Sequence, residues 1–149
     1  GVQVLLNVRG ICCLRPGVKG VSENIEVRSI IDRYLEHARI FYFRNGGHEE
    51  VYLLSADWMR RNLDNRLEIV FPVISETVRR RLIGILETYF ADNIKARRLQ
   101  SDGTCQPAPR SGRRIRAQEE FYREAVEAVR AAEETLVRFR PLKSPEAEG

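Results

Sequence analysis

Residues 37–57 read HARIFYFRNGGHEEVYLLSAD, and this stretch decides the fold class because it holds two apolar runs around a turn signal. The alternating run 39–43 predicts a strand, and 51–54 predicts its partner. Asn45-Gly46 predicts a tight turn between them, because both central positions of such a turn need positive φ. The stretch therefore predicts a β-hairpin.

Apolar periodicity extends this picture to both sides of the hairpin. The expected elements are strands at 2–8 and 67–71, and helices at 22–34, 75–90 and 115–139. We expect the strand at 2–8 to be buried on both faces, whereas the β-branched residues of 22–34 leave a strand as the alternative there. Residues 100–112, rich in Ser, Gly and Pro, predict a loop. The predicted fold class is α/β, a mixed β-sheet flanked by helices with a C-terminal amphipathic helix.

Composition narrows the class of protein. The chain has 149 residues, 43% hydrophobic and 31% charged, with a net charge of +4, which is typical of one globular domain. No apolar run approaches the roughly 20 residues of a membrane helix, and no signal peptide is visible. The sequence opens on a strand-like run without an initiating Met, so we interpret it as a piece of a longer protein.

Cysteine and histidine spacing predicts no metal site. Cys12 and Cys13 are adjacent and Cys105 is far away, so they make a poor disulfide framework. Neither His37 nor His48 lies at zinc-ligand spacing from them. We expect free, mostly buried thiols and no metal-binding residues in this chain.

An anion site is the strongest chemical hypothesis that single residues support. His37 lies at the entry to the strand 39–43 with Arg39 two residues on, so both side chains point to one face of that strand. An imidazole moves protons near neutral pH, and a guanidinium fork matches phosphate oxygens. Arg9, at the end of the first strand, is a third candidate. The alternatives are a surface histidine and an Arg9 that pairs with Glu36 or Glu68.

Other polar groups leave their roles open. Asp57 either belongs to a site or caps the turn that follows it. Arg79-Arg80-Arg81 is interpreted as a solvated helix face, because successive helix residues point about 100° apart. The arginines at 110, 113, 114 and 116 either bind a polyanion or solvate a loop. The sequence has neither a Walker-type loop nor GxGxxG, and no Ser, His and Asp trio in it is specific enough to indicate a hydrolase triad.

Long motifs carry a resemblance to a known family. They are LNVRGICCLRPG (6–17), SENIEVRSIIDRYLEHARIFYFRNGG (22–47), VYLLSADWMRRNLDNRLEIVFPV (51–73), DNIKARRL (92–99) and SGRRIRAQEEFY (111–122). Together they resemble the last catalytic domain of the bacterial polyphosphate kinases, which implies a phospholipase D-like α/β fold, present here in part. His37-Ala38-Arg39 stands for the superfamily's His-x-Lys, and Ser55-Ala56-Asp57 for its Ser-x-Asn, departures that fit the kinase branch.

The resemblance implies reversible transfer of the ATP γ-phosphate to inorganic polyphosphate through a phosphohistidine in a preceding domain that this chain lacks. His37 matches a second family histidine, which assists transfer as acid/base or by stabilising charge. Arg9 matches an arginine that contacts nucleotide phosphates, and Arg66 and Arg39 are further expected phosphate ligands. Magnesium is expected to accompany ATP and to bind mainly outside this chain.

The same resemblance sets expectations for organisation and partners. We expect residues 1–106 to be the C-terminal part of the catalytic domain and 107–149 to be a basic loop and helical extension. Expected partners are ATP or ADP, polyphosphate, upstream domains of the same polypeptide and further copies in a homo-oligomer, but no specific nucleic acid. The expected location is the cytoplasm, with peripheral attachment to the inner membrane as an alternative, and the fragment alone is expected to be inactive.

Two other functions stay open at this point. A non-enzymatic polyanion- or nucleotide-binding module would use Arg9, Arg66 and the basic loop, and its binding would be sensitive to salt. A phospholipase D-like phosphodiesterase would form a phosphohistidine at His37.

Overall fold

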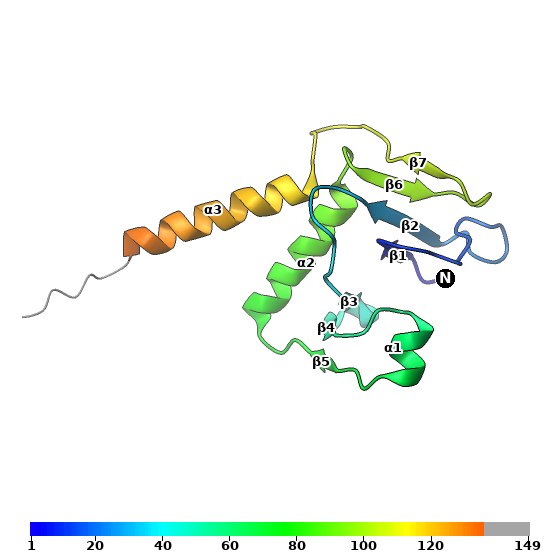
Figure 1. Cartoon of the computed structure of the whole chain (residues 1–149), viewed down its shortest axis with the longest axis horizontal. Helices are drawn as coiled ribbons and strands as arrows, with labels where there is room; N and C mark the ends of the chain where they lie inside the picture. Colours follow the sequence, from blue (N-terminus) through cyan, green and yellow to red (C-terminus); the bar gives the residue numbers. More distant parts are fainter. Residues whose placement is uncertain (136–149) are drawn as a thin grey trace, which may run out of the picture.

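The computed structural model describes residues 1–135, and its strands form two separate sheets (Figure 1). The larger sheet has the order β1-β2-β6-β7, with β1 parallel to β2 and the other neighbours antiparallel. Its strands are β1 (Val4–Asn7), β2 (Ile25–Ile30), β6 (Ala96–Leu99) and β7 (Cys105–Pro107). The predicted α/β class with a mixed sheet is confirmed, although the strands divide between two sheets.

The second sheet contains the predicted hairpin. Its antiparallel order is β3-β4-β5, with β3 (Ile40–Phe43), β4 (Glu50–Leu54) and β5 (Val70–Pro72). The short 3-10 turn η1 (Asn45–Gly47) joins β3 to β4, and Asn45 and Gly46 have φ of 41° and 63°, so the expected positive φ at both positions is confirmed. The last predicted strand starts later than expected, because Ile69 bonds to Ser55 just before β5 begins.

Three helices complete the described residues, namely α1 (Arg60–Asn65), α2 (Glu76–Ala91) and α3 (Ala117–Thr135). α2 contacts β3, β4 and α3, while α3 extends away from both sheets (Figure 1). The expected helices at 75–90 and 115–139 are therefore found, and the part of the second beyond residue 135 lies outside the described residues. No helix within residues 1–135 is both long and apolar enough to cross a membrane.

A buried carboxylate organises the junction between α2, β6 and α3. Asp92 is fully buried at the end of α2. Its Oδ1 accepts hydrogen bonds from the backbone N–H groups of Ile94, Lys95 and Ala96, and its Oδ2 accepts one from Ala117, the first residue of α3. Two helix ends and a strand are thus fixed by one side chain, beside a core of Ile30, Tyr89, Ala96, Ala108 and Ala117.

Some expected elements are corrected by the structure. The helix expected at 22–34 is wrong, and the alternative, strand β2, is found because it pairs with both β1 and β6. The loop expected at 100–112 includes β7, paired with the unpredicted β6, whose sequence ARRL lacks apolar alternation.

Two expected burials are also wrong. β1 is not buried on both faces, since Leu5 is 47% exposed in this edge strand. The cysteines are free as expected, but Cys13 and Cys105 are exposed, because one follows β1 in a loop and the other lies in edge strand β7.

Candidate functional site

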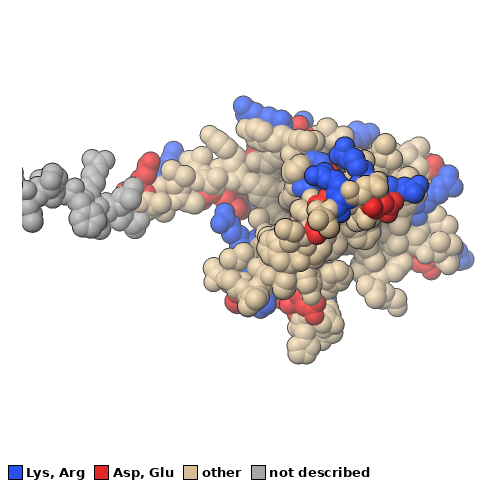
Figure 2. Space-filling view, turned by 60° about the horizontal axis from the view of Figure 1, so that its bottom comes forward, with Lys and Arg blue, Asp and Glu red and all other residues tan. Residues whose placement is uncertain are grey.

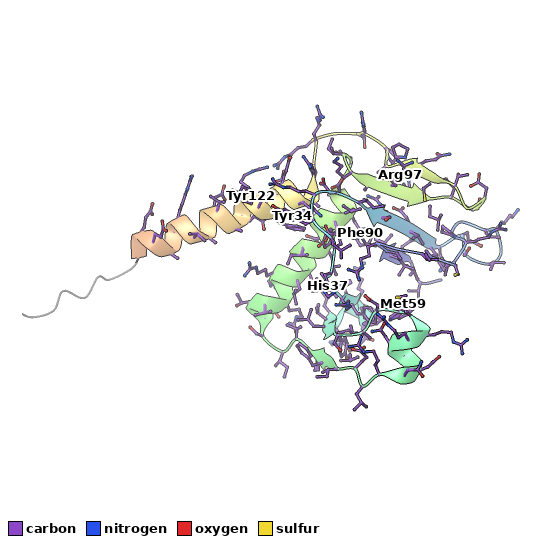
Figure 3. The ribbon with its side chains drawn as sticks, viewed as in Figure 1. Tyr34, His37, Met59, Phe90, Arg97 and Tyr122 are labelled. Carbon is purple, nitrogen blue, oxygen red and sulfur yellow. The ribbon has the colours of Figure 1, made fainter. Side chains whose placement is uncertain are left out.

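Four polar side chains meet where the two sheets come together. Arg9 follows β1 of the larger sheet, His37 and Arg39 precede β3, and Asp57 follows β4. Because β3 and β4 are antiparallel, the start of one and the end of the other lie at the same end of the hairpin. Figure 3 shows His37 between the β1–β2 strands and this hairpin. Arg9 and Asp57, which are 48 positions apart in the chain, therefore reach hydrogen-bonding distance.

Asp57 bridges two arginines. Its Oδ1 accepts a hydrogen bond from Arg39 Nε at 3.0 Å, and its Oδ2 accepts one from Arg9 Nη2 at 3.3 Å. The bond from Arg39, with the charges of Arg39 and Arg9, holds the pKa of Asp57 below its ordinary value. The side chain makes no capping bond to α1, whose N-cap is Met59, so the capping interpretation is wrong.

His37 lies against the guanidinium of Arg39. Nη1 of Arg39 is 3.1 Å from Nδ1 of His37, and Nη2 is 3.2 Å from Nε2. A neutral imidazole has only one acceptor nitrogen, so at most one of these contacts is a hydrogen bond. His37 is exposed while the Arg39 side chain is 18% exposed, so a ligand that reaches the imidazole meets a cation fixed beside it.

Arg9 is anchored at its other side by the segment that carries His37. Its Nη1 donates to the backbone carbonyl of Glu36 at 2.6 Å. The expected alternative, a pair with the carboxylate of Glu36 or Glu68, is therefore not what the structure has, because Asp57 is the ionic partner. Two of the guanidinium's five N–H groups are used in this way, and the others remain for an anion.

The carboxylate of Glu36 is held by the two long helices. Tyr89 of α2 donates its hydroxyl hydrogen bond to Glu36 Oε2, and Gln118 of α3 donates to Oε1 at 2.6 Å. Burial, followed by this bond to Glu36, raises the pKa of Tyr89. Sequence reasoning considered Glu36 only as a partner of Arg9 and missed Tyr89 and Gln118, for which the sequence holds no local signal.

The start of α3 also fixes the segment between the two sheets. The Gln118 side chain accepts from the backbone N–H of Tyr34 at 2.9 Å and donates to its carbonyl at 2.8 Å, as a neighbouring strand would. Arg116 makes two bonds of 2.7 Å to the carboxylate of Asp32. Figure 3 shows Tyr34 beside the start of α3. The segment that leads to His37 is thus tied to a helix more than 80 residues further along the chain.

Arg66 lies at the margin of this arrangement. Its side chain is 56% exposed and its Nε is 3.7 Å from the carboxylate of Glu68. Hydrogen bonds from Ser55 and Asn62 are the main cause of a lowered pKa of Glu68, and the charges of Arg66 and Arg39 contribute. Glu68 therefore links Arg66 to the cluster through charge, whereas Arg9, Arg39, His37 and Asp57 are in direct contact.

Several charged side chains outside this cluster form ion pairs. Arg113 contacts the carboxylate of Glu120, and Arg79 and Arg80 of α2 both pair with Glu76, in agreement with a solvated helix face. Figure 2 shows lysine and arginine side chains gathered on part of the forward face, with acidic side chains next to them. Within residues 1–135 there is no group of three or more His, Cys, Asp or Glu placed to hold a metal ion.

A cavity of about 540 Å³ lies beside the cluster, between the β3–β5 sheet and α2. Arg39 and Ser55 lie at its lining, but most of the wall is apolar, including Leu54, Phe71 and Leu82. Apolar walls offer no hydrogen bonds to phosphate oxygens. An anion is therefore expected at the Arg9–Arg39–His37 cluster and not in this cavity.

Comparison with known proteins gives one consistent family. The family described as "Polyphosphate kinase C-terminal domain 2" matches residues 1–118. Polyphosphate kinase of Rhodopirellula baltica is 56% identical over 129 residues, which are 85% of this chain and 15% of that protein. The enzyme of Lactiplantibacillus plantarum is 46% identical over 99% of this chain and 22% of its own length.

A solved structure agrees with these relatives. The crystal structure of polyphosphate kinase from Porphyromonas gingivalis superposes with a TM-score of 0.79 at 47% identity, over 91% of this chain and 20% of that one. The chain therefore spans about a fifth or less of the length of these relatives.

Proposed function

Because this chain belongs to the polyphosphate kinase family, as part of its C-terminal domain 2, we propose that it supplies one side of a site for reversible transfer of the ATP γ-phosphate to inorganic polyphosphate. The chain acts as part of a longer polypeptide and is inactive alone. The proposal rests on the family match and on one observation, the contact of Arg9, Arg39 and His37 through shared partners.

The charges in this cluster suit phosphate. Two guanidinium groups and one carboxylate leave a net charge of +1 before any ligand binds. Arg9 keeps unused N–H groups, whereas all three nitrogens of Arg39 already face Asp57 or His37. Phosphoryl transfer depends mainly on positioning and on neutralising charge on the phosphate oxygens. Two arginines held by one shared carboxylate beside an exposed imidazole meet both requirements.

We assign the residues distinct roles. Arg9 binds nucleotide phosphates and Arg39 neutralises charge on the group in transfer, while Arg66 is an outer phosphate ligand. His37 assists transfer as acid/base or by stabilising charge. The nucleophile that forms the phosphohistidine lies in a preceding domain outside this chain, and His48, in the hairpin turn, has no part in it.

Magnesium does not fit the two carboxylates beside Arg9, Arg39 and His37. Hard oxygen ligands are what Mg²⁺ requires. The carboxylate of Asp57 is used by two arginines, and that of Glu36 by Tyr89 and Gln118. This supports the expectation that a magnesium ion that accompanies ATP binds mainly outside this chain.

Organisation and location complete the proposal. Residues 1–106 form the catalytic part and 107–149 the basic loop and extension, and the first turn of α3 packs against the catalytic part through Gln118. The partners are ATP or ADP, polyphosphate and the upstream domains, within a homo-oligomer in the cytoplasm.

The test uses the full-length protein and the variant His37→Ala, with His48→Ala as the matched control because His48 is also exposed. We expect turnover of ATP with polyphosphate to fall by about 10²- to 10⁴-fold in the first variant and to stay unchanged in the second. Equal melting temperatures establish that both variants fold. Wild-type turnover in His37→Ala would refute the assignment.

The phosphodiesterase alternative is tested on the same full-length protein, with His37→Ala as the control that lacks the imidazole. That activity would hydrolyse a simple phosphodiester and leave phosphate bound to His37. We expect neither hydrolysis of such a substrate nor labelled phosphate on His37. A trapped phosphohistidine at this position would favour the alternative.

A further inference from the structure

Asp57 stands between the two arginines that the proposed function assigns to phosphate binding. Each carboxylate oxygen serves one of them, Oδ1 the Nε of Arg39 and Oδ2 the Nη2 of Arg9. The far side of each guanidinium has a different partner, His37 for Arg39 and the carbonyl of Glu36 for Arg9. Asp57 is thus the shared contact of the two cations, which come from different sheets.

Charge and geometry explain why a carboxylate is needed at this point. Two guanidinium groups beside one another repel, and an anion between them removes this repulsion. An amide of the same shape has one acceptor oxygen, and its NH₂ group would face a second donor. Asparagine at position 57 could therefore hold Arg9 or Arg39 but not both.

The exposure of the three side chains favours a role in the site. Asp57, Arg9 and Arg39 are 27%, 29% and 18% exposed, so the bridge is fixed by its surroundings while its edge still faces solvent. By contrast, the Arg60–Asp64 pair of the neighbouring α1 is 96% and 54% exposed and bridges nothing else. A bridge between two sheets that stays accessible is suited to orienting groups toward a ligand.

We propose that Asp57 is a positioning residue that holds Arg9 and Arg39 in the mutual orientation needed to engage one phosphate chain. This inference rests on the proposed function, since it assigns Asp57 a role through those two arginines. Asp57 itself does not contact the phosphate, because two anions would repel. It sets the direction of the N–H groups that do.

The experiment compares Asp57→Asn with Asp64→Asn in the full-length protein, using ATP and polyphosphate as substrates. We expect Asp57→Asn to lower kcat by about ten- to a hundredfold, because misdirected donors cost more in the transition state than in binding. KM for ATP should change less than about threefold, because the two cations remain. Asp64→Asn should match the wild type in both constants.

Arg9→Ala gives the contrasting pattern. Removing a direct phosphate ligand should raise KM for ATP about tenfold. In a protein that already carries Arg9→Ala and Arg39→Ala, adding Asp57→Asn should lower kcat no further, because its targets are gone. A purely structural role would lower kcat again in that background and would overturn the inference.

Two further measurements keep the test decisive. If Asp57→Asn melts well below the wild type, the variant Arg39→Lys is used in its place. An ammonium group cannot bond to Asp57 and lie along His37 at once, so we expect the same loss of kcat. Wild-type kcat in Asp57→Asn, with His37→Ala inactive, would refute this inference alone. Full activity in His37→Ala and Arg9→Ala would instead refute the proposed function.

Discussion

The two sheets differ in how completely they are packed. The larger sheet closes on α2 and α3 around Ile30, Tyr89 and Ala117, with exposures of 2%, 8% and 0%. The β3–β5 sheet and α1 bury little beyond Val51, Ala56 and Asn62. Around them, the large apolar side chains of Trp58, Leu67 and Ile69 are 76%, 104% and 65% exposed.

The well-packed region supports the candidate site, whereas the lightly packed region carries its reactive side chains. Well-packed regions open rarely, whereas lightly packed ones carry the groups that move on binding. His37, Arg39 and Asp57 flank strands of the lightly packed sheet. Glu36, next to His37, is held by helices of the well-packed region. The candidate site therefore has accessible side chains on a segment that Tyr89 and Gln118 of the well-packed region hold in place.

The largest effect is expected at the centre of the well-packed region. Asp92→Ala would leave four backbone N–H groups without this acceptor, and those of Ala96 and Ala117 are buried. We expect the free energy of unfolding, measured by urea denaturation, to fall by about 3 kcal/mol or more. Asp92→Asn keeps one acceptor oxygen, so its free energy of unfolding should lie between those of the wild type and Asp92→Ala. A loss below about 1 kcal/mol in the alanine variant would contradict the role of Asp92.

The link between the regions is tested by Tyr89→Phe. Loss of the hydroxyl leaves Glu36 with one fewer donor, and we expect about 1–2 kcal/mol of lost stability. Activity should also fall, because Glu36 adjoins His37 and its carbonyl anchors Arg9. The control Tyr42→Phe breaks an exposed bond to Glu49 and should leave the turnover rate unchanged. Equal turnover in both variants would argue against coupling between the regions.

A pH dependence is expected in the lightly packed region. The pKa of Asp57 in the folded protein lies below its ordinary value of 3.8, chiefly because Arg39 donates to it. Its contribution to stability is therefore complete above that ordinary value and is lost as pH falls through the folded pKa. The wild type should exceed Asp57→Asn by at most about 1 kcal/mol at neutral pH. The unfolding curves of the wild type and of Asp57→Asn should converge under strongly acidic conditions. A stability difference that grows there would contradict a lowered pKa of Asp57.

The smallest effect is expected on the surface of α1. Arg60→Ala removes an i, i+4 pair with Asp64 that is open to solvent. We expect less than about 0.5 kcal/mol of lost stability by urea denaturation and no change in turnover. A larger loss would mean that α1 is more firmly packed than its exposed apolar residues indicate.

Local signals were enough to predict the hairpin and α2 from the sequence. The Asn45-Gly46 pair specifies its own turn, and the helix at 75–90 has a complete apolar face. They were not enough for β2 and β6, because a strand's partners decide its conformation as much as its residues do. The β-branched segment 22–34 fits both a helix and a strand pattern, and only pairing with β1 and β6 selects the strand.

The candidate site was predictable only where its residues are near one another in the chain. The spacing of His37 and Arg39 alone predicted that the two side chains lie together, and the structure has them in contact, although both precede strand β3, which begins at Ile40. The partners of Arg9 depend on the tertiary fold, so spacing suggested Glu36 or Glu68 as ionic partner and missed Asp57. The hold of Tyr89 and Gln118 on Glu36 joins residues 53 and 82 positions apart and leaves no local pattern.

The bonds of Gln118 also set an order of assembly. They close a loop of 84 residues back to Tyr34, so the segment before His37 leaves the ribosome long before its last anchor is synthesised. Contacts of such long range form late, because loop closure must precede any gain from them. We therefore expect the segment that carries His37 to be fixed late in folding. A nascent chain that stops short of α3 lacks the bonds of Gln118 to Tyr34 and Glu36.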